Sequence, residues 1–331
     1  MVHPIAEANE KSPFGNLTPA EFYPRHSVSH SSEFITNSRG LKLFTQWWTP
    51  LLSSAPTGVI CMAHGFTCES SRAVQLTAVH FTKAGFIVCA IDYQGHGFSD
   101  GLKAHIPDVN SVVDDCIAFY DGFRERHAPP SVPSFLYGES LGGAIALLIT
   151  LRRGRVDGPR LGFDGVVLSG AMCRISNKFT PPWPLPHLLG LLAALVPTWP
   201  VAFTRGRGSI LERSLKVKWK QKMETGGPNT YRGWPRAATA HALMKVCEEL
   251  KGRFKAVDVP FLIVHGGNDV ICDPASVEDL YRRASSKDKT LKIYPGMWHL
   301  LVGEPDDNVE LVFGDVLDWL KTRALRFTPT T

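Results

Sequence analysis

Six short apolar runs alternate along the chain with segments of helical periodicity, and this alternation is the feature that most constrains the fold. The runs are rich in Val, Ile, Leu and Phe, a composition typical of strands buried on both faces of a sheet. They span residues 58–63, 86–91, 134–137, 165–168, 261–264 and 291–294. The helical segments are 73–84, 109–123, 145–152 and 306–324. Strands alternating with helices predict an α/β fold, in which a mostly parallel sheet is covered by helices on both faces.

The alternation is interrupted between residues 173 and 249. This segment is rich in Pro, Trp and Lys, contains no strand-like run, and lies between two clear strands. We therefore expect a helical cap over the C-terminal edge of the sheet. The predicted organisation is a flexible N-terminal leader at 1–31, an α/β core at 32–172 and 250–324, the cap at 173–249, and a C-terminal tail at 325–331.

The cysteines and the N-terminus bear on the cellular compartment. Seven cysteines are spread along the chain without a C-x-x-C pair, which predicts reduced core thiols and neither a disulfide framework nor a metal site. The longest largely apolar stretch, Leu188 to Pro197, is about half of the roughly 20 residues that a membrane-spanning helix needs. Residues 1–18 lack the basic and then apolar order of a secretory signal. These features favour a cytoplasmic location.

The segment Gly138-Glu139-Ser140-Leu141-Gly142-Gly143 joins a predicted strand to a helix-prone segment. A G-x-S-x-G motif fits this position because its serine must sit on a sharp, strained turn, where only small neighbours let the backbone pass closely. Ser140 is therefore the candidate nucleophile. The alternative interpretation is a glycine-rich turn without chemistry, but that would not require a strand before it and a helix after it.

A serine hydroxyl needs a general base within hydrogen-bond reach, and the base needs a third group to orient it. Asp269 and His299 each follow a predicted strand, and the order of serine, acid and histidine along the chain is the one typical of this motif. Asp273 is the rival acid, although its place directly before a proline resembles a helix cap. Three other histidines, each before a glycine at a strand end, are interpreted as turn-stabilising: His64, His96 and His265.

The negative charge that develops on a tetrahedral intermediate needs preorganised N–H donors. One candidate donor is the N–H of Leu141, directly after the candidate nucleophile. The other is the N–H of Phe66, in the turn after the strand predicted at 58–63, with Thr67 as the alternative. The residues expected to contact a substrate are His64, Gly65, Thr67, Glu139, Leu188 and Leu192.

Five sequence blocks, in the same order, resemble the monoacylglycerol lipase family. They are His64-Gly65, Asp92 to Gly101, Gly138 to Gly143, His265 to Asp269, and Tyr294 to His299. The resemblance covers about Phe34 to Leu320 and is closest to the plant branch, which includes lysophospholipase-like and caffeoylshikimate esterase-like members. It implies an α/β-hydrolase core, a mobile cap and no metal or organic cofactor. It also implies the nucleophile, acid and base roles for Ser140, Asp269 and His299.

The resemblance implies hydrolysis of monoacylglycerols or related esters. We therefore predict a serine hydrolase that cleaves the ester of a monoacylglycerol or lysophospholipid through an acyl-enzyme. The alternatives are an esterase or acyltransferase acting on phenolic, hydroxycinnamoyl-type esters, and a ligand-binding receptor with little or no turnover. The cap and Phe66-Thr67-Cys68 depart from the relatives, which often have a small residue in that turn, so the substrate stays open. The sequence also leaves acyl-chain length and oligomeric state open.

Apolar and basic residues gather in the predicted cap. Between Ala171 and Arg236, eleven Lys and Arg stand against two Glu, a net charge of +9 in a chain whose total is +5. One interpretation is a rim, including Leu188 and Leu192, that inserts partly into an anionic lipid surface. The other is that the leucines pack on the core and the charges are simply solvated. No nucleic-acid partner is expected, because no nucleic-acid-binding module is recognisable.

Overall fold

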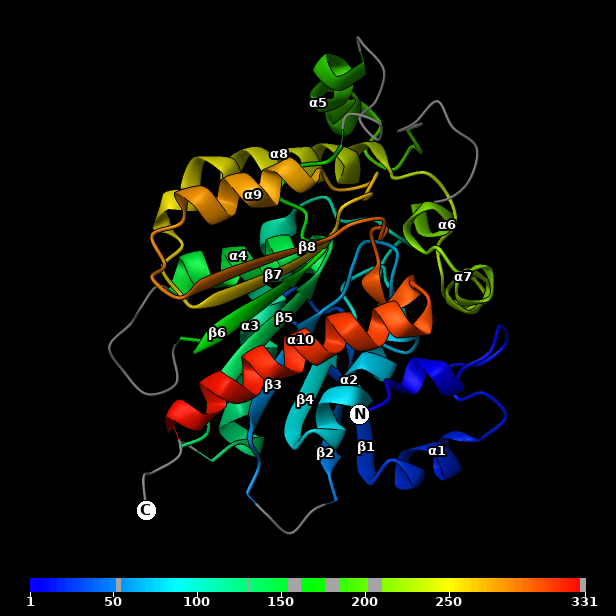
Figure 1. Cartoon of the computed structure of the whole chain (residues 1–331). Helices are drawn as coiled ribbons and strands as arrows, with labels where there is room; N and C mark the ends of the chain where they lie inside the picture. The colour runs from blue at the N-terminus through cyan, green and yellow to red at the C-terminus, as the bar shows by residue number, and fades with distance from the viewer. Residues whose placement is uncertain (52–54, 130, 154–161, 177–184, 202–209, 328–331) are drawn as a thin grey trace.

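The computed structural model describes residues 1–51, 55–129, 131–153, 162–176, 185–201 and 210–327 (Figure 1). Within them, eight strands form one sheet in the order β1-β2-β4-β3-β5-β6-β7-β8. β2 is antiparallel to both β1 and β4, and all other neighbouring strands are parallel. The strands are β1 Val28–Thr36, β2 Lys42–Pro50, β3 Gly58–Ala63, β4 Phe86–Ile91, β5 Ser134–Glu139, β6 Gly165–Ser169, β7 Phe261–Gly266 and β8 Lys289–Tyr294. The predicted α/β fold with a mostly parallel sheet is confirmed.

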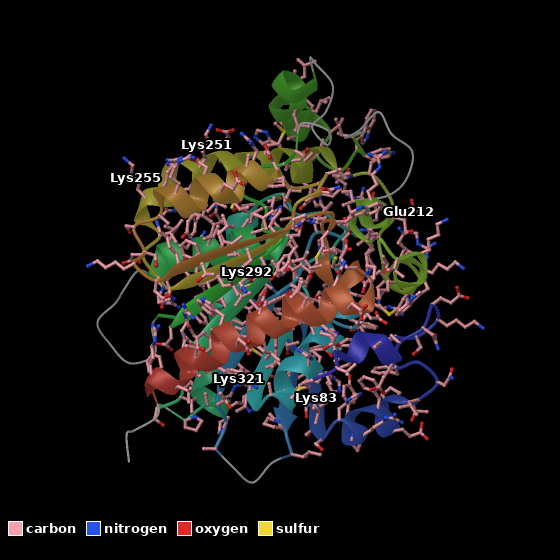
Figure 2. All side chains as sticks on the ribbon, in the orientation of Figure 1. Lys83, Glu212, Lys251, Lys255, Lys292 and Lys321 are labelled. Carbon is pink, nitrogen blue, oxygen red and sulfur yellow. The ribbon has the colours of Figure 1, made fainter. Side chains whose placement is uncertain are left out.

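Helices cover both faces of the sheet (Figure 1). One face packs against α3 Val109–His127, α4 Leu141–Arg153, α8 Ala237–Arg253 and α9 Pro274–Arg283. The other face packs against α2 Ala73–Lys83 and α10 Asp306–Ala324. Side chains fill the space between these layers, whereas the exposed Lys251 and Lys255 project outward near the end of α8 (Figure 2).

The apolar runs are continuous because the inner strands are buried on both faces. In β3, Val59 and Cys61 join the core under α3 and α4, while Ile60 and Met62 join the core under α2 and α10. All four side chains are at most 1% exposed. Each of the six apolar runs of the sequence lies within one of the strands β3 to β8. Of the strands that carry the candidate site, β3, β5 and β7 are buried along their whole length, whereas β8 at the edge of the sheet is only partly buried.

The N-terminal segment 1–31 is packed, unlike the flexible leader expected from its polar sequence. It forms the 3-10 helix η1 Pro4–Glu7, α1 Pro19–Arg25 and the start of β1. Ile5 and Phe22 are at most 1% exposed and belong to the core on the face of α2 and α10. The physical reason for the difference is that these few apolar side chains bury against a distant part of the chain. At the other end, the tail begins with η4 Leu325–Phe327, and 328–331 lie outside the described residues.

The predicted cap contains α5 Leu185–Leu195, α6 Ile210–Ser214, α7 Lys218–Thr225 and most of α8. Residues 177–184 and 202–209 of it lie outside the described part of the chain. α5 lies beyond α8, farther from the sheet (Figure 1). α8 packs against α3 and α4 and joins their core cluster through Leu243, Val246 and Leu250, so the boundary predicted at residue 249 falls inside a helix of the core layer. Across the described ranges, no helix combines the length and the apolar character that crossing a membrane requires.

Two buried side chains, those of Lys220 and Glu224, attach α7 to the core. The Nζ of Lys220, which is 1% exposed, donates to the carbonyl oxygens of Val302 and Glu304 at 3.3 and 2.7 Å and to Oδ1 of Asp306 at 2.9 Å. Glu224 Oε1 accepts from the N–H of Ala73 at 2.6 Å and so caps the N-terminus of α2. α7 is therefore fixed both to α2 and to the loop before α10.

We predict that Lys220→Met lowers the free energy of unfolding by about 3 kcal/mol, because it leaves buried carbonyl oxygens without a donor and Asp306 without its cation. Chemical denaturation followed by tryptophan fluorescence measures this loss. The matched control is Lys222→Met on the same helix, whose side chain is 67% exposed and which should change stability little. Equal effects of the two substitutions would contradict a stabilising role for the buried ammonium group of Lys220.

Candidate active site

Ser140 lies in the tight turn between β5 and α4, with a φ of 55°. This left-handed backbone is strained for a residue with a side chain, and it persists only where the surroundings impose it. Two glycines allow the turn to close. A Cβ added at Gly142 would lie 1.9 Å from the carbonyl oxygen of Ala63 in β3, and one added at Gly138 would lie 2.4 Å from that of Gly142. Close backbone contacts therefore fix the G-x-S-x-G spacing.

The structure brings together the three residues predicted to cooperate. Nε2 of His299 lies 2.8 Å from Oγ of Ser140, and Nδ1 of His299 lies 2.6 Å from Oδ2 of Asp269. Because the three residues follow the parallel strands β5, β7 and β8, they meet at the carboxyl edge of the sheet. All three are buried. With the hydroxyl donating to Nε2 and Nδ1–H donating to the carboxylate, a proton can pass from Ser140 to His299.

Donors on both carboxylate oxygens fix Asp269. The N–H groups of Ile271 and Cys272 donate to Oδ1 at 2.8 and 3.0 Å, and Nε2 of His265 lies 3.1 Å from Oδ2. Burial alone would raise the pKa of Asp269, but the charge of His299 and the hydrogen bonds from His265 and His299 outweigh it and hold that pKa below its usual range. The carboxylate is therefore charged and oriented before any substrate arrives.

The rival acid and the second histidine have separate places. Asp273 caps α9, as its sequence context predicts, by accepting from the N–H of Ala275 at 3.0 Å. His265 is fully buried, and sequence reasoning missed its contact with Asp269. In the sequence, the only signal of this contact was the four-residue spacing of His265 and Asp269, which carries little information in a loop that follows a strand.

The two predicted N–H donors flank Ser140. Leu141 is the first residue of α4, so its N–H has no intrahelical acceptor. In the other wall, a Cβ added at Gly65 would lie 3.2 Å from Cβ of Ser140, which places the turn containing Phe66 directly against the serine. Phe66 lines the cavity at Ser140, whereas Thr67 is buried and has a φ of 65°.

The cavity beside Ser140 is lined mainly by apolar side chains. Core elements contribute Gly65, Phe66, Cys68, Met172, Ile271, Cys272 and Leu300, and the predicted cap contributes Ile175, Ile210, Leu211, Ser214, Pro235 and Leu243. His64, Thr67 and Glu139 surround this cavity without lining it, and neither Leu188 nor Leu192 reaches it. Leu192 instead packs with Leu189 on α8, and Leu188 is 47% exposed. Substrate contact by these residues stays a prediction.

Comparisons with known proteins agree with this geometry. The profile of the family described as serine aminopeptidase, S33 matches residues 54–306. Caffeoylshikimate esterase of Arabidopsis thaliana is 31% identical over 96% of this chain and 93% of its own length. Human monoglyceride lipase is 27% identical over 88% of this chain and 90% of its own. A crystal structure of monoglyceride lipase from Saccharomyces cerevisiae superposes with a TM-score of 0.75 at 23% identity, covering 88% of this chain and 94% of that one.

The chain belongs to the S33 family of serine hydrolases. The predicted α/β-hydrolase fold and the predicted resemblance to monoacylglycerol lipases are confirmed. The family's description names a peptidase, but both of these relatives are named for the cleavage of carboxylic esters. Those names agree with the enzyme class predicted for this S33 chain, a carboxylic ester hydrolase.

A group of buried carboxylates beside Ser140 was not recognised in the sequence as a unit. Burial raises the pKa of Glu139 to about 7, although the charge of His299 opposes it. Burial also raises the pKa of Glu224 to about 8, with the carboxylates of Glu139 and Glu69 acting in the same direction. These side chains come from β5, α7 and the turn after β3, so only the fold brings them together.

One group in the described ranges gathers enough ligand atoms for a metal ion: Asp269, Cys272 and His299, whose atoms lie within 4.8 Å of one another. Asp269 and His299 already hydrogen-bond each other at 2.6 Å. Burial raises the pKa of the Cys272 thiol well above its usual value, which disfavours the thiolate that a metal requires. The donor set therefore does not fit a resident metal.

We predict that Glu224→Gln changes the pH dependence of stability. A carboxyl group whose pKa is raised by folding binds its proton more tightly in the native state, so its contribution to stability is lost as pH rises from about 5 through its folded pKa near 8. Gln keeps the acceptor for Ala73 but cannot ionise. The melting temperature of the variant should therefore exceed that of the unchanged protein at pH 9 and approach it at pH 5. Glu125→Gln, at an exposed position, is the control. A difference in melting temperature that is the same at both pH values would contradict the raised pKa of Glu224.

Proposed function

We propose that this S33 chain hydrolyses the carboxylic ester of a monoacylglycerol or lysophospholipid, with Ser140 as nucleophile, His299 as general base and Asp269 as the acid that orients it. The observation that carries the proposal is the chain of two short hydrogen bonds, 2.8 Å from His299 to Ser140 and 2.6 Å from His299 to Asp269, at one end of an apolar cavity. An activated hydroxyl beside an apolar cavity is suited to a fatty acyl ester.

In the proposed reaction, Oγ of Ser140 attacks the ester carbonyl carbon while Nε2 of His299 takes its proton. Asp269 stabilises the imidazolium that forms, and the N–H groups of Phe66 and Leu141 receive the negative oxygen of the tetrahedral intermediate. The intermediate collapses when His299 returns the proton to the leaving alcohol, so the acyl group stays on Ser140. Water then repeats the sequence, releasing the fatty acid and restoring the hydroxyl.

The lining of the cavity supports an alkyl acyl group over an aromatic one. Its side chains are mostly aliphatic or sulfur-containing, and among the described residues Phe66 is the one Phe, Tyr or Trp in the lining. Aliphatic walls adapt to a flexible chain, whereas a planar aromatic acid gains more from stacking partners. A second candidate, a phenolic or hydroxycinnamoyl ester, is favoured by the 31% identity to a caffeoylshikimate esterase.

We predict that a fluorophosphonate probe labels the protein at Ser140 and that Ser140→Ala abolishes both labelling and ester cleavage. The loss in kcat should be about 10⁴-fold or more, because no other activated nucleophile replaces the hydroxyl. On a substrate panel, fatty acid release from 2-monooleoylglycerol should exceed hydrolysis of caffeoyl and feruloyl esters.

Three outcomes of these assays would oppose parts of the proposal. A faster reaction with the hydroxycinnamoyl esters would transfer the assignment to the second candidate. Labelling without turnover of any ester would indicate a ligand-binding receptor. Unchanged cleavage by Ser140→Ala would remove the proposed mechanism. Ser169→Ala, at the end of the neighbouring strand β6, is the matched control for a serine substitution.

We further propose that α5 makes peripheral contact with lipid surfaces. Leu188, Leu191 and Leu195 recur on one side of the helix and are 47%, 58% and 70% exposed, and Trp199 nearby is 66% exposed. The opposite side packs on α8 through Leu189. An exposed apolar face beside a basic segment attracts anionic membranes. Lys220 contributes nothing to this attraction because its ammonium group is buried. A cytoplasmic location is proposed with it, supported by seven free, buried cysteines.

We predict that the protein co-sediments with vesicles containing phosphatidylserine at low ionic strength and that roughly 0.5 M salt weakens this binding. Replacing Leu191 and Leu195 together with Asp should reduce it at least about fivefold, because charged side chains oppose insertion into the interface. Leu311→Asp is the control, since Leu311 is 54% exposed on the distant helix α10. Absence of binding at low salt, or equal losses in the two variants, would refute the contact.

A further inference from the structure

His64 lies at the end of β3, next to the turn that flanks Ser140, and both of its ring nitrogens are engaged. Nδ1 lies 2.8 Å from the carbonyl oxygen of Gly65, and Nε2 accepts the N–H of Tyr93 at 3.3 Å. A backbone N–H can only donate, so Nε2 carries no proton and Nδ1 does. Burial lowers the pKa of His64 to about 4, which agrees with a neutral ring in this tautomer.

The bond from Nδ1–H to Gly65 fixes the direction of the next N–H. The carbonyl of Gly65 and the N–H of Phe66 belong to one planar trans peptide, so they point in opposite directions. The same carbonyl also accepts from the N–H of Cys68 at 3.2 Å, which closes a turn over residues 65–68. With its carbonyl held on one side, this peptide has to present the N–H of Phe66 on the other.

The turn needs this support because its backbone is strained. Thr67 occupies the third position with a φ of 65°, where glycine or asparagine is usual and a β-branched residue is rare. A turn that a side chain disfavours persists only if its surroundings over-determine it. The hydrogen bonds of His64 and Cys68 to Gly65 supply that constraint at the first residue of the turn.

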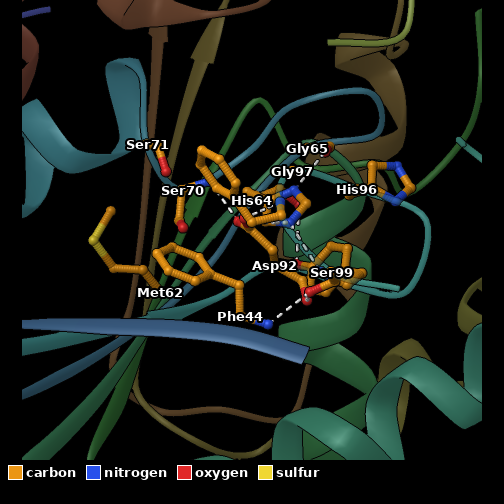
Figure 3. A network of polar contacts seen from close by, with 12 residues as sticks. Phe44, Met62, His64, Gly65, Ser70, Ser71, Asp92, His96, Gly97 and Ser99 are labelled. Atoms are coloured by element: carbon orange, nitrogen blue, oxygen red, sulfur yellow. Dashed lines mark hydrogen bonds and ion pairs between the residues drawn. The ribbon is translucent and has the colours of Figure 1, made fainter. Parts of the chain in front are cut away.

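A buried carboxylate holds the chain just beyond the same turn, as Figure 3 shows. Oδ1 of Asp92 accepts from the N–H of Ser70 at 2.7 Å, and Oδ2 accepts from that of Phe98 at 3.1 Å. Ser99 Oγ donates to the carbonyl oxygen of Asp92 at 2.6 Å and accepts from the N–H of Phe44 in β2 at 2.8 Å. The ring of His64 stacks on Tyr93, the residue after Asp92, at 3.9 Å. The turn is therefore held at both ends.

We propose that His64 is a positioning residue that aims the N–H of Phe66 at the reacting carbonyl, with Asp92 fixing the far end of the turn. This inference rests on the proposed function, in which that N–H stabilises the oxyanion. It gives His64 a role other than the direct substrate contact or simple turn stabilisation expected from the sequence. His64 touches no substrate and acts through the peptide that follows it.

Two substitutions separate the two ring nitrogens. The side-chain amide of Asn reaches about as far as Nδ1, so His64→Asn can still donate to Gly65, whereas Gln reaches about as far as Nε2, so His64→Gln keeps only the acceptor for Tyr93. With 2-monooleoylglycerol, His64→Gln should lose about 100-fold in kcat with KM changed less than about threefold, the loss typical of one misplaced oxyanion donor. His64→Asn should retain kcat within about fivefold.

A trifluoromethyl ketone with an alkyl chain provides a second measurement. Ser140 adds to its carbonyl and forms an anionic hemiketal, so its affinity for His64→Gln should fall in parallel with kcat/KM, while inhibition by the product oleate stays unchanged. Equal losses of kcat in the Asn and Gln variants, full activity of His64→Gln, or unchanged ketone affinity would each overturn the proposal. If His64→Gln is not recovered folded, the ketone affinity of His64→Asn tests the proposal instead. A 100-fold loss of that affinity would also overturn the proposal, because Asn keeps the donor to Gly65.

The unchanged protein and Ser140→Ala are assayed beside these variants. Ester cleavage that survives Ser140→Ala removes the proposed function itself. If cleavage depends on Ser140 but is the same in His64→Asn and His64→Gln, only the role of His64 is removed. The two failures are therefore distinguishable.

Discussion

The closely packed turn at Ser140 is the constraint on which the rest of the site depends. The turn requires glycine at 138 and 142, because a Cβ at 138 would collide with the carbonyl oxygen of Gly142 and a Cβ at 142 with that of Ala63 at the end of β3. That contact sets the start of α4, and with it the N–H of Leu141, against the turn that contains Phe66. One steric requirement thus positions the nucleophile and both candidate oxyanion donors together. The acid and base need only arrive at the same edge, which the parallel order of β5, β7 and β8 ensures.

The base depends on a second constraint, which comes from the predicted cap. The N–H of Leu300, directly after His299, donates to the carbonyl oxygen of Ser214 at 2.9 Å, and the carbonyl of Gly303 accepts from the N–H groups of residues 216 and 217. Lys220 then satisfies the carbonyls of Val302 and Glu304. Residues 214–220 therefore act as an outer wall for the loop that carries the imidazole. The cap and the catalytic geometry are consequently not separable, although the sequence suggests an insert placed on a finished core.

Local patterns carry the parts of this structure that could be read from the sequence. An apolar run followed by glycines is a short-range signal, and such signals located Ser140, Asp269 and the strands β3 to β8. The remaining features depend on contacts between distant residues. Glu224 caps a helix 151 positions away, and Lys220 binds carbonyls more than 80 positions away. In the sequence alone, both look like ordinary charged residues on a solvent-exposed helix. The N-terminal segment was misjudged for the same reason, since Ile5 and Phe22 find their partners only in the folded chain.

These constraints also limit how a substrate can enter. Beside the residues that the structure describes, the cavity at Ser140 has about 50 Å³ of free volume, which is little room for a long acyl chain. Moving α7 would break the contacts of Lys220 and Glu224 and would displace the loop that holds His299. The site would then be open, but its general base would be out of position. Among the described residues, α5 has no such bonds to the site. Leu189 packs it on α8, one of its sides is exposed, and the segment after it accepts hydrogen bonds from Ala237 and Ala238 at the start of α8. We therefore expect a rearrangement that admits an acyl chain and keeps the imidazole on Ser140 to involve the α5 side of the cap, where Leu188, Leu191 and Leu195 face outward.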